Sequence, residues 1–229
     1  MAENKTTTAA GTEELQVVEQ AKDFWSKYSK PVLYAGSAIV LILGGWLGYK
    51  QLILEPKQIK ANDAISKAQA YFAKDSLNLA LNGDGSGAGF LKVIKNYSGT
   101  DAANLAHYYA GAIYLRQDNF NKAIEYLEKF STDATQVQSA AYKMLGDAYM
   151  SAGKKDEGVS FYLKAGNLNQ EDEYLSSENL YLAAMAYMAD GKNKESIEVL
   201  KTIKEKYPKS EKGANVDKYL AKLGVIEND

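Results

Sequence analysis

The sequence has no cysteine, and its 229 residues include a single histidine and only three prolines. Without cysteine the chain cannot form disulfide bonds, iron–sulfur clusters, thiolate zinc sites or cysteine nucleophiles. With His107 alone it cannot build a histidine-rich metal site. A net charge of −2 argues against a nucleic-acid partner, which needs a strongly basic surface. We therefore expect a protein that is not an enzyme and that uses no cofactor.

Charge is also missing from one long segment, residues 31–49, and apolar residues continue beyond Lys50. A helix needs about 20 apolar residues to cross a hydrocarbon core. Pro31 suits the first turn of such a helix, where its missing N–H is no loss, and Pro56 fits just beyond its end. The sequence therefore predicts a single transmembrane helix over residues 31–54, in contact with membrane lipid.

Two other structures could give such a segment. A cleaved signal peptide is disfavoured because the run is long, begins about 30 residues into the chain and is not followed by a cleavage site of small residues. A buried core helix is disfavoured because nothing else in the chain is large enough to enclose it. Gly44 and Gly48 form one G-x-x-x-G motif, which favours close approach of another transmembrane helix.

Residues 1–30 form a short tail before this segment. Within it, apolar residues recur at spacings of three and four, which indicates one apolar stripe on a helix. The stripe includes Leu15, Val18, Trp25 and Tyr28. Such a helix could lie at the membrane surface or dock on a membrane partner, and the two roles are compatible.

Residues 55–229 show internal repetition close to the 34-residue tetratricopeptide period. Each copy has a large residue, a small pair, a tyrosine, a small residue nine positions later and a large residue four further on. The copies are His107, Ala110, Gly111, Tyr114, Ala123 and Leu127; Tyr142, Leu145, Gly146, Tyr149, Gly158 and Tyr162; and Leu180, Ala183, Ala184, Tyr187, Ser196 and Leu200. The small residues are expected to let paired helices touch, with turns at 117–119, 152–154 and 190–192.

A poorer copy precedes these three, and residues 213–223 have the spacing of a capping helix. The predicted fold is therefore all-α: one N-terminal transmembrane helix, then a tetratricopeptide solenoid with a C-terminal capping helix. In the poorer copy, the glycine-rich segment Asn82–Gly89 is interpreted as a flexible turn joining two long helices. A calcium loop is disfavoured because Val93 stands where a bidentate glutamate is needed.

His107 occupies a packing position of its repeat, so we expect it to pack rather than to act as a ligand or a base. The better functional candidates lie on the first helix of each pair, facing the inside of a superhelix, where solenoids bind extended peptides. Burial by a neighbouring repeat is the alternative for some of them. The predicted peptide groove consists of Phe72, Tyr108, Leu115, Arg116, Lys143, Asp147, Met150, Tyr181, Met185 and Met188.

The order of tail, span and repeats resembles the YfgM-like ancillary subunit of the bacterial SecYEG translocon, and the likeness covers nearly the whole chain. The stretches Leu81–Gly85 and Ala103–Gly111 look like the Bacteroidetes branch of such proteins. The resemblance implies a single-pass protein of the bacterial inner membrane with a cytoplasmic N-terminus and periplasmic repeats. The lysines around the span do not orient it, so this topology depends on the resemblance alone.

The resemblance also implies partners: SecYEG, a membrane-anchored peptidyl-prolyl isomerase of the PpiD type, and unfolded secreted proteins. No catalytic residue is carried over from the family. The expected function is non-enzymatic assistance to secreted chains in the periplasm. The alternative is a scaffold for another envelope assembly complex with the same anchor.

Overall fold

The computed structural model describes residues 7–225, with the side chains of Lys22 and of residues 24–225. All regular elements in this range are helices. The chain divides into two compact units, Met1–Pro56 and Lys57–Asp229. The first contains α1 (Thr7–Tyr49) and the π-helix η1 (Lys50–Leu54), and α2 (Glu55–Ala73) begins at its end.

The two prolines do not bound the apolar helix, so that prediction is wrong. Pro31 lies inside α1, which continues without a break on both sides. A proline in a helix removes one hydrogen bond and crowds the carbonyl four residues back, and the many other turns of this 43-residue helix keep it intact. Pro56 is the second residue of α2 and directly follows the π-helix, in which Glu55 N–H donates to the carbonyl of Lys50. The wider π-turn accommodates the crowding that the Pro56 ring imposes on Leu52.

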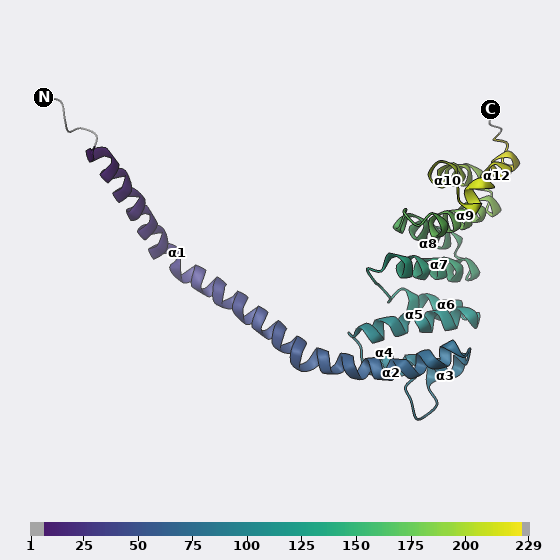
Figure 1. The fold of residues 1–229 in the computed structure, drawn as a ribbon, viewed down its shortest axis with the longest axis horizontal. Helices are drawn as coiled ribbons and strands as arrows, with labels where there is room; N and C mark the ends of the chain where they lie inside the picture. Colours follow the sequence, from purple (N-terminus) through teal and green to yellow (C-terminus); the bar gives the residue numbers. More distant parts are fainter. Residues whose placement is uncertain (1–6, 226–229) are drawn as a thin grey trace. The chain divides into compact units, whose positions relative to one another are not determined.

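The repeat domain consists of helix pairs, each contacting the next along the chain (Figure 1). Three pairs are regular: α5 (Asp101–Arg116) with α6 (Phe120–Leu127), α7 (Thr135–Ser151) with α8 (Lys155–Leu168), and α9 (Glu173–Ala189) with α10 (Asn193–Lys206). Before them lie α2, α3 (Leu77–Asn82) and α4 (Phe90–Asn96); after them lie α11 (Glu211–Ala214) and α12 (Val216–Lys222). The predicted capping region is helical, and it is divided at Asn215.

The turns inside the pairs share one backbone geometry. Each has a residue of positive φ, which is Asp118 at 56°, Gly153 at 78° and Gly191 at 73°. The turn after α2 repeats it with Asp75 at 58°. Glycine adopts this conformation freely and aspartate tolerates it. The structure confirms the three predicted turns and adds the fourth.

Close helix contacts depend on glycine, as predicted. A Cβ placed on Gly111 would lie 2.5 Å from Leu127 Cγ, and one on Gly146 would lie 2.5 Å from the Tyr162 ring. Leu127 and Tyr162 come from the second helix of the same pairs, α6 and α8. Alanines at the small-residue positions, such as Ala110 and Ala183, have no exposed surface.

The segment Asn82–Gly89 does not join two long helices, so that part of the prediction is wrong. The flanking helices α3 and α4 have six and seven residues. The first pair is short because α3 ends at Gly83, whose φ of 86° favours glycine. The loop then returns to Gly89, where a Cβ would lie 2.5 Å from the Leu81 carbonyl oxygen.

Candidate functional site

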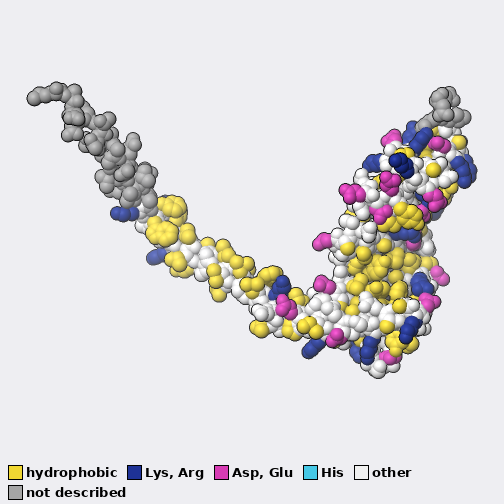
Figure 2. All heavy atoms as spheres, in the orientation of Figure 1, with side chains coloured by type: hydrophobic (Ala, Val, Ile, Leu, Met, Phe, Trp, Pro, Cys, Tyr) yellow, Lys and Arg dark blue, Asp and Glu magenta, His cyan; other side chains and the backbone are white. Residues whose placement is uncertain are grey.

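The predicted groove residues come from four helices, and none of them is fully buried. Arg116 is exposed and the other nine are partly exposed. Phe72 lies on α2; Tyr108, Leu115 and Arg116 on α5; Lys143, Asp147 and Met150 on α7; Tyr181, Met185 and Met188 on α9. We call this set the first-helix face. Figure 2 shows hydrophobic side chains gathered over the part of the repeat domain around α5 to α7.

Part of the first-helix face packs against neighbouring helices, which was the alternative for these residues. The Phe72 ring lies 5.0 Å from the ring of Tyr109 and 6.4 Å from that of Phe90, between centroids. Leu115 packs against the same core, and the Met150 side chain fills the space above Gly158. These side chains contribute to the packing of the solenoid and remain partly exposed.

The charged members of the face form ion pairs. Arg116 Nη2 lies 2.6 Å from Asp75 Oδ1, which links the end of α5 to the turn after α2. Lys143 Nζ lies 3.0 Å from Asp147 Oδ2 on the same helix. The sequence placed these residues on one face but did not predict the partner of Arg116, because that contact spans 41 positions.

Asp147 is also tied to the second helix of its pair. Its Oδ1 accepts a hydrogen bond of 2.7 Å from the Tyr162 hydroxyl. Burial of Tyr162 raises the pKa of its phenol, and the bond to Asp147 raises it further. With both carboxylate oxygens occupied, Asp147 is held in place between Lys143 and Tyr162.

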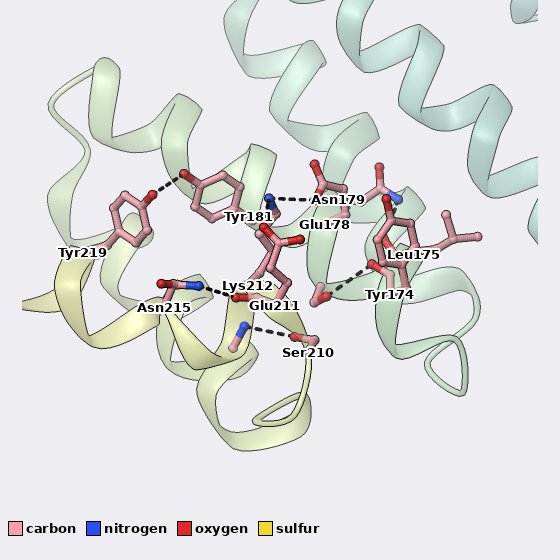
Figure 3. Close-up of polar contacts among 12 residues, drawn as sticks. Tyr174, Leu175, Glu178, Asn179, Tyr181, Ser210, Glu211, Lys212, Asn215 and Tyr219 are labelled. Atoms are coloured by element: carbon pink, nitrogen blue, oxygen red, sulfur yellow. Dashed lines mark hydrogen bonds and ion pairs between the residues drawn. The ribbon is translucent and has the colours of Figure 1, made fainter.

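The C-terminal helices extend the first-helix face beyond α9 (Figure 3). The Tyr181 hydroxyl donates a hydrogen bond of 2.8 Å to the Tyr219 hydroxyl on α12. Lys212 Nζ from α11 lies 4.9 Å from the centre of the Tyr181 ring and 3.1 Å from Glu178 Oε2. Met185 packs into the hydrophobic cluster shared by α9, α10 and α12. The sequence analysis missed this extension because α11 and α12 do not follow the repeat pattern.

A cavity of about 590 Å³ lies among α8, α9 and α10, and the sequence analysis did not predict it. It is lined by Asp156, Ser160, Leu163, Lys164, Asn167, Tyr187, Lys192 and Glu195. Charges of both signs face it, and Lys192 pairs with Asp156 across it. Because the acidic and basic residues lining this cavity balance, it favours neither an anionic nor a cationic ligand.

The apolar helix exposes its side chains. Leu41 is 75% exposed and Ile42 is 70% exposed. A Cβ on Gly44 or Gly48 would meet nothing within 4 Å, so both glycines are open to a neighbouring helix. Trp25 and Tyr28 are exposed as well, whereas the side chains of Leu15 and Val18 lie outside the described residues. In length and composition this helix meets the requirement for crossing a membrane, a requirement that a signal sequence near an N-terminus also meets.

The glycine-rich loop is organised around Asp84 by hydrogen bonds from its own surroundings. The Tyr71 hydroxyl donates to Asp84 Oδ2 at 2.8 Å, and the Gly87 N–H donates to Oδ1 at 2.6 Å. The Tyr71 hydroxyl contributes most to lowering the pKa of the Asp84 carboxyl. Within the described part of the chain no cluster of histidine and acidic residues could hold a metal ion. Asp84 thus closes the loop onto α2.

His107 is half-buried, with its ring centre 5.7 Å from that of Tyr126. Burial lowers the pKa of the imidazole, the nearby Lys129 ammonium lowers it further, and Glu125 opposes the shift. His107 Nδ1 is buried and has no hydrogen-bond partner among the described residues. The ring packs against Tyr126, in agreement with the prediction for this position.

Comparison with protein families identifies the repeats. Tetratricopeptide-repeat families match residues 105–133, 139–172 and 178–210. These ranges correspond to the pairs α5–α6, α7–α8 and α9–α10. No curated protein matches the chain at a significant level. The chain therefore carries tetratricopeptide repeats, which serve as scaffolds for protein–protein interaction.

Proposed function

We propose that the chain is a non-enzymatic, membrane-anchored repeat protein that associates with the SecYEG translocon and assists the periplasmic handling of secreted proteins. The observation that carries the proposal is the order of the parts. One exposed apolar helix of membrane-spanning length precedes three matched tetratricopeptide repeats. Such an order is suited to holding a protein-binding scaffold at a membrane surface.

The anchor supplies the membrane attachment in this proposal. Its exposed leucine and isoleucine side chains gain favourable contacts in lipid, and helices in lipid associate through small residues that let backbones approach. Gly44 and Gly48, both open, are the proposed contact with a membrane-spanning partner. Trp25 and Tyr28, with Leu15 and Val18, would add contacts at the membrane interface.

The first-helix face supplies the binding of polypeptide. Tyr108, Met185 and Met188 are partly exposed and offer aromatic and flexible apolar surface. Aromatic side chains contribute large contact areas, and methionine adapts to varied partners. The ion pairs at Arg116 and at Lys143 fix the polar edges of this surface. A flexible secreted chain, or an extended segment of a PpiD-type partner, is the proposed ligand.

The proposed topology places the N-terminus in the cytoplasm and the repeats in the periplasm of a bacterial inner membrane. Protease added to intact spheroplasts should then digest the repeats and leave a tag at the N-terminus protected. Digestion of the tag with survival of the repeats would overturn the localisation and the proposed function with it.

Association with the translocon is tested by purifying the full chain from membranes in a mild detergent and identifying its partners by quantitative mass spectrometry. We expect SecYEG subunits and a PpiD-type isomerase, enriched over a purification of an unrelated single-pass protein. Recovery of subunits of a different envelope assembly, without translocon subunits, would favour the alternative scaffold function.

A further inference from the structure

The C-terminal end of the first-helix face contains a small polar cavity of about 220 Å³. Six residues line it: Tyr181, Glu211, Lys212, Asn215, Lys218 and Tyr219. Tyr181 comes from α9 and the others come from α11, α12 and the residue between them. Figure 3 shows Tyr181 and Tyr219 facing each other beside Lys212. The cavity exists because the capping helices fold against the last repeat.

The tyrosine pair leaves a hydrogen-bond donor available in the cavity. Because the Tyr181 hydroxyl donates to the Tyr219 oxygen, the Tyr219 proton is free to bond elsewhere. Among the described residues, Tyr219 has no acceptor for this proton apart from Tyr181. The Tyr181 bond lowers the pKa of Tyr219, and Lys218, Lys222 and Lys212 lower it further. A more acidic hydroxyl is a stronger donor to an anion.

Lysine ammonium groups lie close to the two tyrosine rings. Lys218 Nζ lies 5.1 Å from the centre of the Tyr219 ring and forms no ion pair within the described part of the chain. Lys212 Nζ is paired with Glu178 at 3.1 Å, and its contact with Glu211 is looser at 3.7 Å. The Glu211 side chain is 76% exposed, so water competes strongly for that contact. A guest carboxylate could replace it at Lys212.

We propose that this cavity binds a carboxylate side chain of an acidic segment in the polypeptide held by the first-helix face. Lys218 and Lys212 supply the positive charge, and the Tyr219 hydroxyl donates the hydrogen bond that fixes the position of the carboxylate. Charge complementarity selects an acidic segment over a basic one. The inference rests on the proposed function, because the segment belongs to a polypeptide bound along α5, α7 and α9.

The test uses the full chain in a mild detergent and two fluorescein-labelled, unstructured peptides of 12 residues. Both carry the same aromatic and aliphatic residues; one ends in Asp-Glu-Asp and the other in Asn-Gln-Asn, and both have amidated C-termini. Binding is measured by fluorescence anisotropy at low and high salt. We expect the acidic peptide to bind about fivefold more tightly at low salt, with the advantage shrinking as salt screens the charges.

Two lysines on α12 give a matched pair of variants. Lys218 lines the cavity. Lys222 does not line the cavity, although its Nζ lies 5.7 Å from the centre of the Tyr219 ring. Lys218→Gln should weaken binding of the acidic peptide about three- to fivefold and leave the neutral peptide unchanged. Lys222→Gln removes the same charge from the same helix and should have a smaller effect on either peptide.

A third variant predicts a gain of binding. Glu211→Gln removes the carboxylate that competes for Lys212, so the acidic peptide should bind about twofold more tightly and the neutral peptide should not change. If Lys218 and Glu211 only stabilised the fold, replacing Glu211 would not strengthen peptide binding while replacing Lys218 weakens it. Circular dichroism at 222 nm checks that each variant keeps its helices.

The outcomes separate the two proposals. Equal binding of both peptides, or equal effects of Lys218→Gln and Lys222→Gln, would overturn the carboxylate site while leaving the peptide-binding face intact. Failure of both peptides to bind would overturn the peptide-binding face, and the carboxylate site with it.

Discussion

The apolar helix α1 and the repeat domain use the same kinds of residue in opposite ways. Leu41 and Ile42 in α1 are 75% and 70% exposed, whereas Leu200 and Ile203 in α10 have no exposed surface. Full burial of one such side chain contributes about 1.5–3 kcal/mol, so a helix that leaves a whole series of them open requires lipid or a partner. The repeat domain buries its own apolar residues and has no such requirement.

Glycine shows the same contrast. Gly44, Gly45 and Gly48 in α1 have open space around them, whereas Gly111 and Gly146 are in contact with a neighbouring helix. In the repeats, glycine is needed because a larger residue would clash with a side chain of the neighbouring helix. In α1, it leaves room for a contact that the chain does not make by itself. The difference indicates that the two regions depend on different surroundings, and the following changes test it.

Separating the two regions should have the largest effect. Residues 58–229 should fold alone as a soluble, helical monomer, because each pair buries its apolar face on its neighbour. Residues 1–57 should require detergent or lipid to stay in solution. Circular dichroism and size-exclusion chromatography measure both fragments. Aggregation of the repeat fragment, or the absence of a helical spectrum, would show that its core needs the apolar helix.

Truncating one leucine in each region should give the next largest difference. Leu200→Ala removes a fully buried side chain, and we expect the free energy of unfolding of the repeats to fall by about 2–5 kcal/mol. Leu41→Ala removes an exposed one and should leave that free energy unchanged. Urea denaturation in mild detergent, followed at 222 nm, measures both variants. Similar losses for the two would contradict the contrast in burial.

Adding one methyl group to a glycine in each region should have a smaller effect. The new Cβ of Gly146→Ala would lie 2.5 Å from the Tyr162 ring, which is held by its bond to Asp147. Overpacking costs about 1–3 kcal/mol and the better helix propensity of alanine returns roughly 1 kcal/mol, so we expect a net loss of up to about 2 kcal/mol. Gly45→Ala, in open space, should cost nothing. The same denaturation experiment decides, and a stabilised Gly146→Ala variant would contradict the tight contact.

The smallest effect concerns an ion pair at the turn edge. Asp190 lies 2.7 Å from Lys155 Nζ and 3.3 Å from Lys192 Nζ. The Lys155 hydrogen bond, followed by that of Lys192, lowers the pKa of the Asp190 carboxyl in the folded protein. The stabilisation is therefore complete above the unfolded pKa of about 3.9 and is lost as the pH falls through the lower folded value.

Asp190→Asn should accordingly be slightly less stable than the original protein at pH 7, with the difference disappearing on acidification below about pH 4. Asp133→Asn, at an exposed loop position, serves as the control and should show no such dependence. Denaturation midpoints across pH measure the two variants. A difference at Asp190 that persists at low pH would show that the pairs with Lys155 and Lys192 are not its source.

The sequence predicted what depends on local pattern. The three repeats, their turns and the glycine contacts all follow from residues close together in the chain, whose spacing is set by helix geometry. The first pair was predicted less well, because Gly83 ends α3 early and Asp84 closes the loop onto Tyr71. The prediction that the two prolines bound the apolar helix was wrong, since a long helix tolerates Pro31 and a π-turn accommodates Pro56.

The sequence predicted which residues lie on the first-helix face, but not which residues they contact. Repeat spacing assigned Arg116 and Tyr181 to one face, but their partners Asp75 and Tyr219 lie 41 and 38 positions away. No periodic signal marks α11 and α12 as part of that face. Contacts of this kind depend on how the helices pack, and local spacing does not determine them.

The central claim is that the anchor and the first-helix face have separate roles, and one co-purification experiment with two double variants tests it most directly. The variants of the full chain are Gly44→Leu with Gly48→Leu, and Tyr181→Glu with Met188→Glu. Gly36→Leu, about 100° around the axis of α1 from the other two glycines, and Leu168→Glu, 38% exposed on the second helix α8, are the matched controls. Each is purified in mild detergent, and bound membrane proteins and cross-linked polypeptides are quantified by mass spectrometry.

The account predicts that the glycine variant loses its membrane partner while its repeats stay folded and keep their polypeptide cross-links. The Tyr181 and Met188 variant should keep the membrane partner and lose those cross-links. If the glycine changes have no effect while the Tyr181 and Met188 changes release the membrane partner, docking occurs through the repeats and the division of roles is wrong.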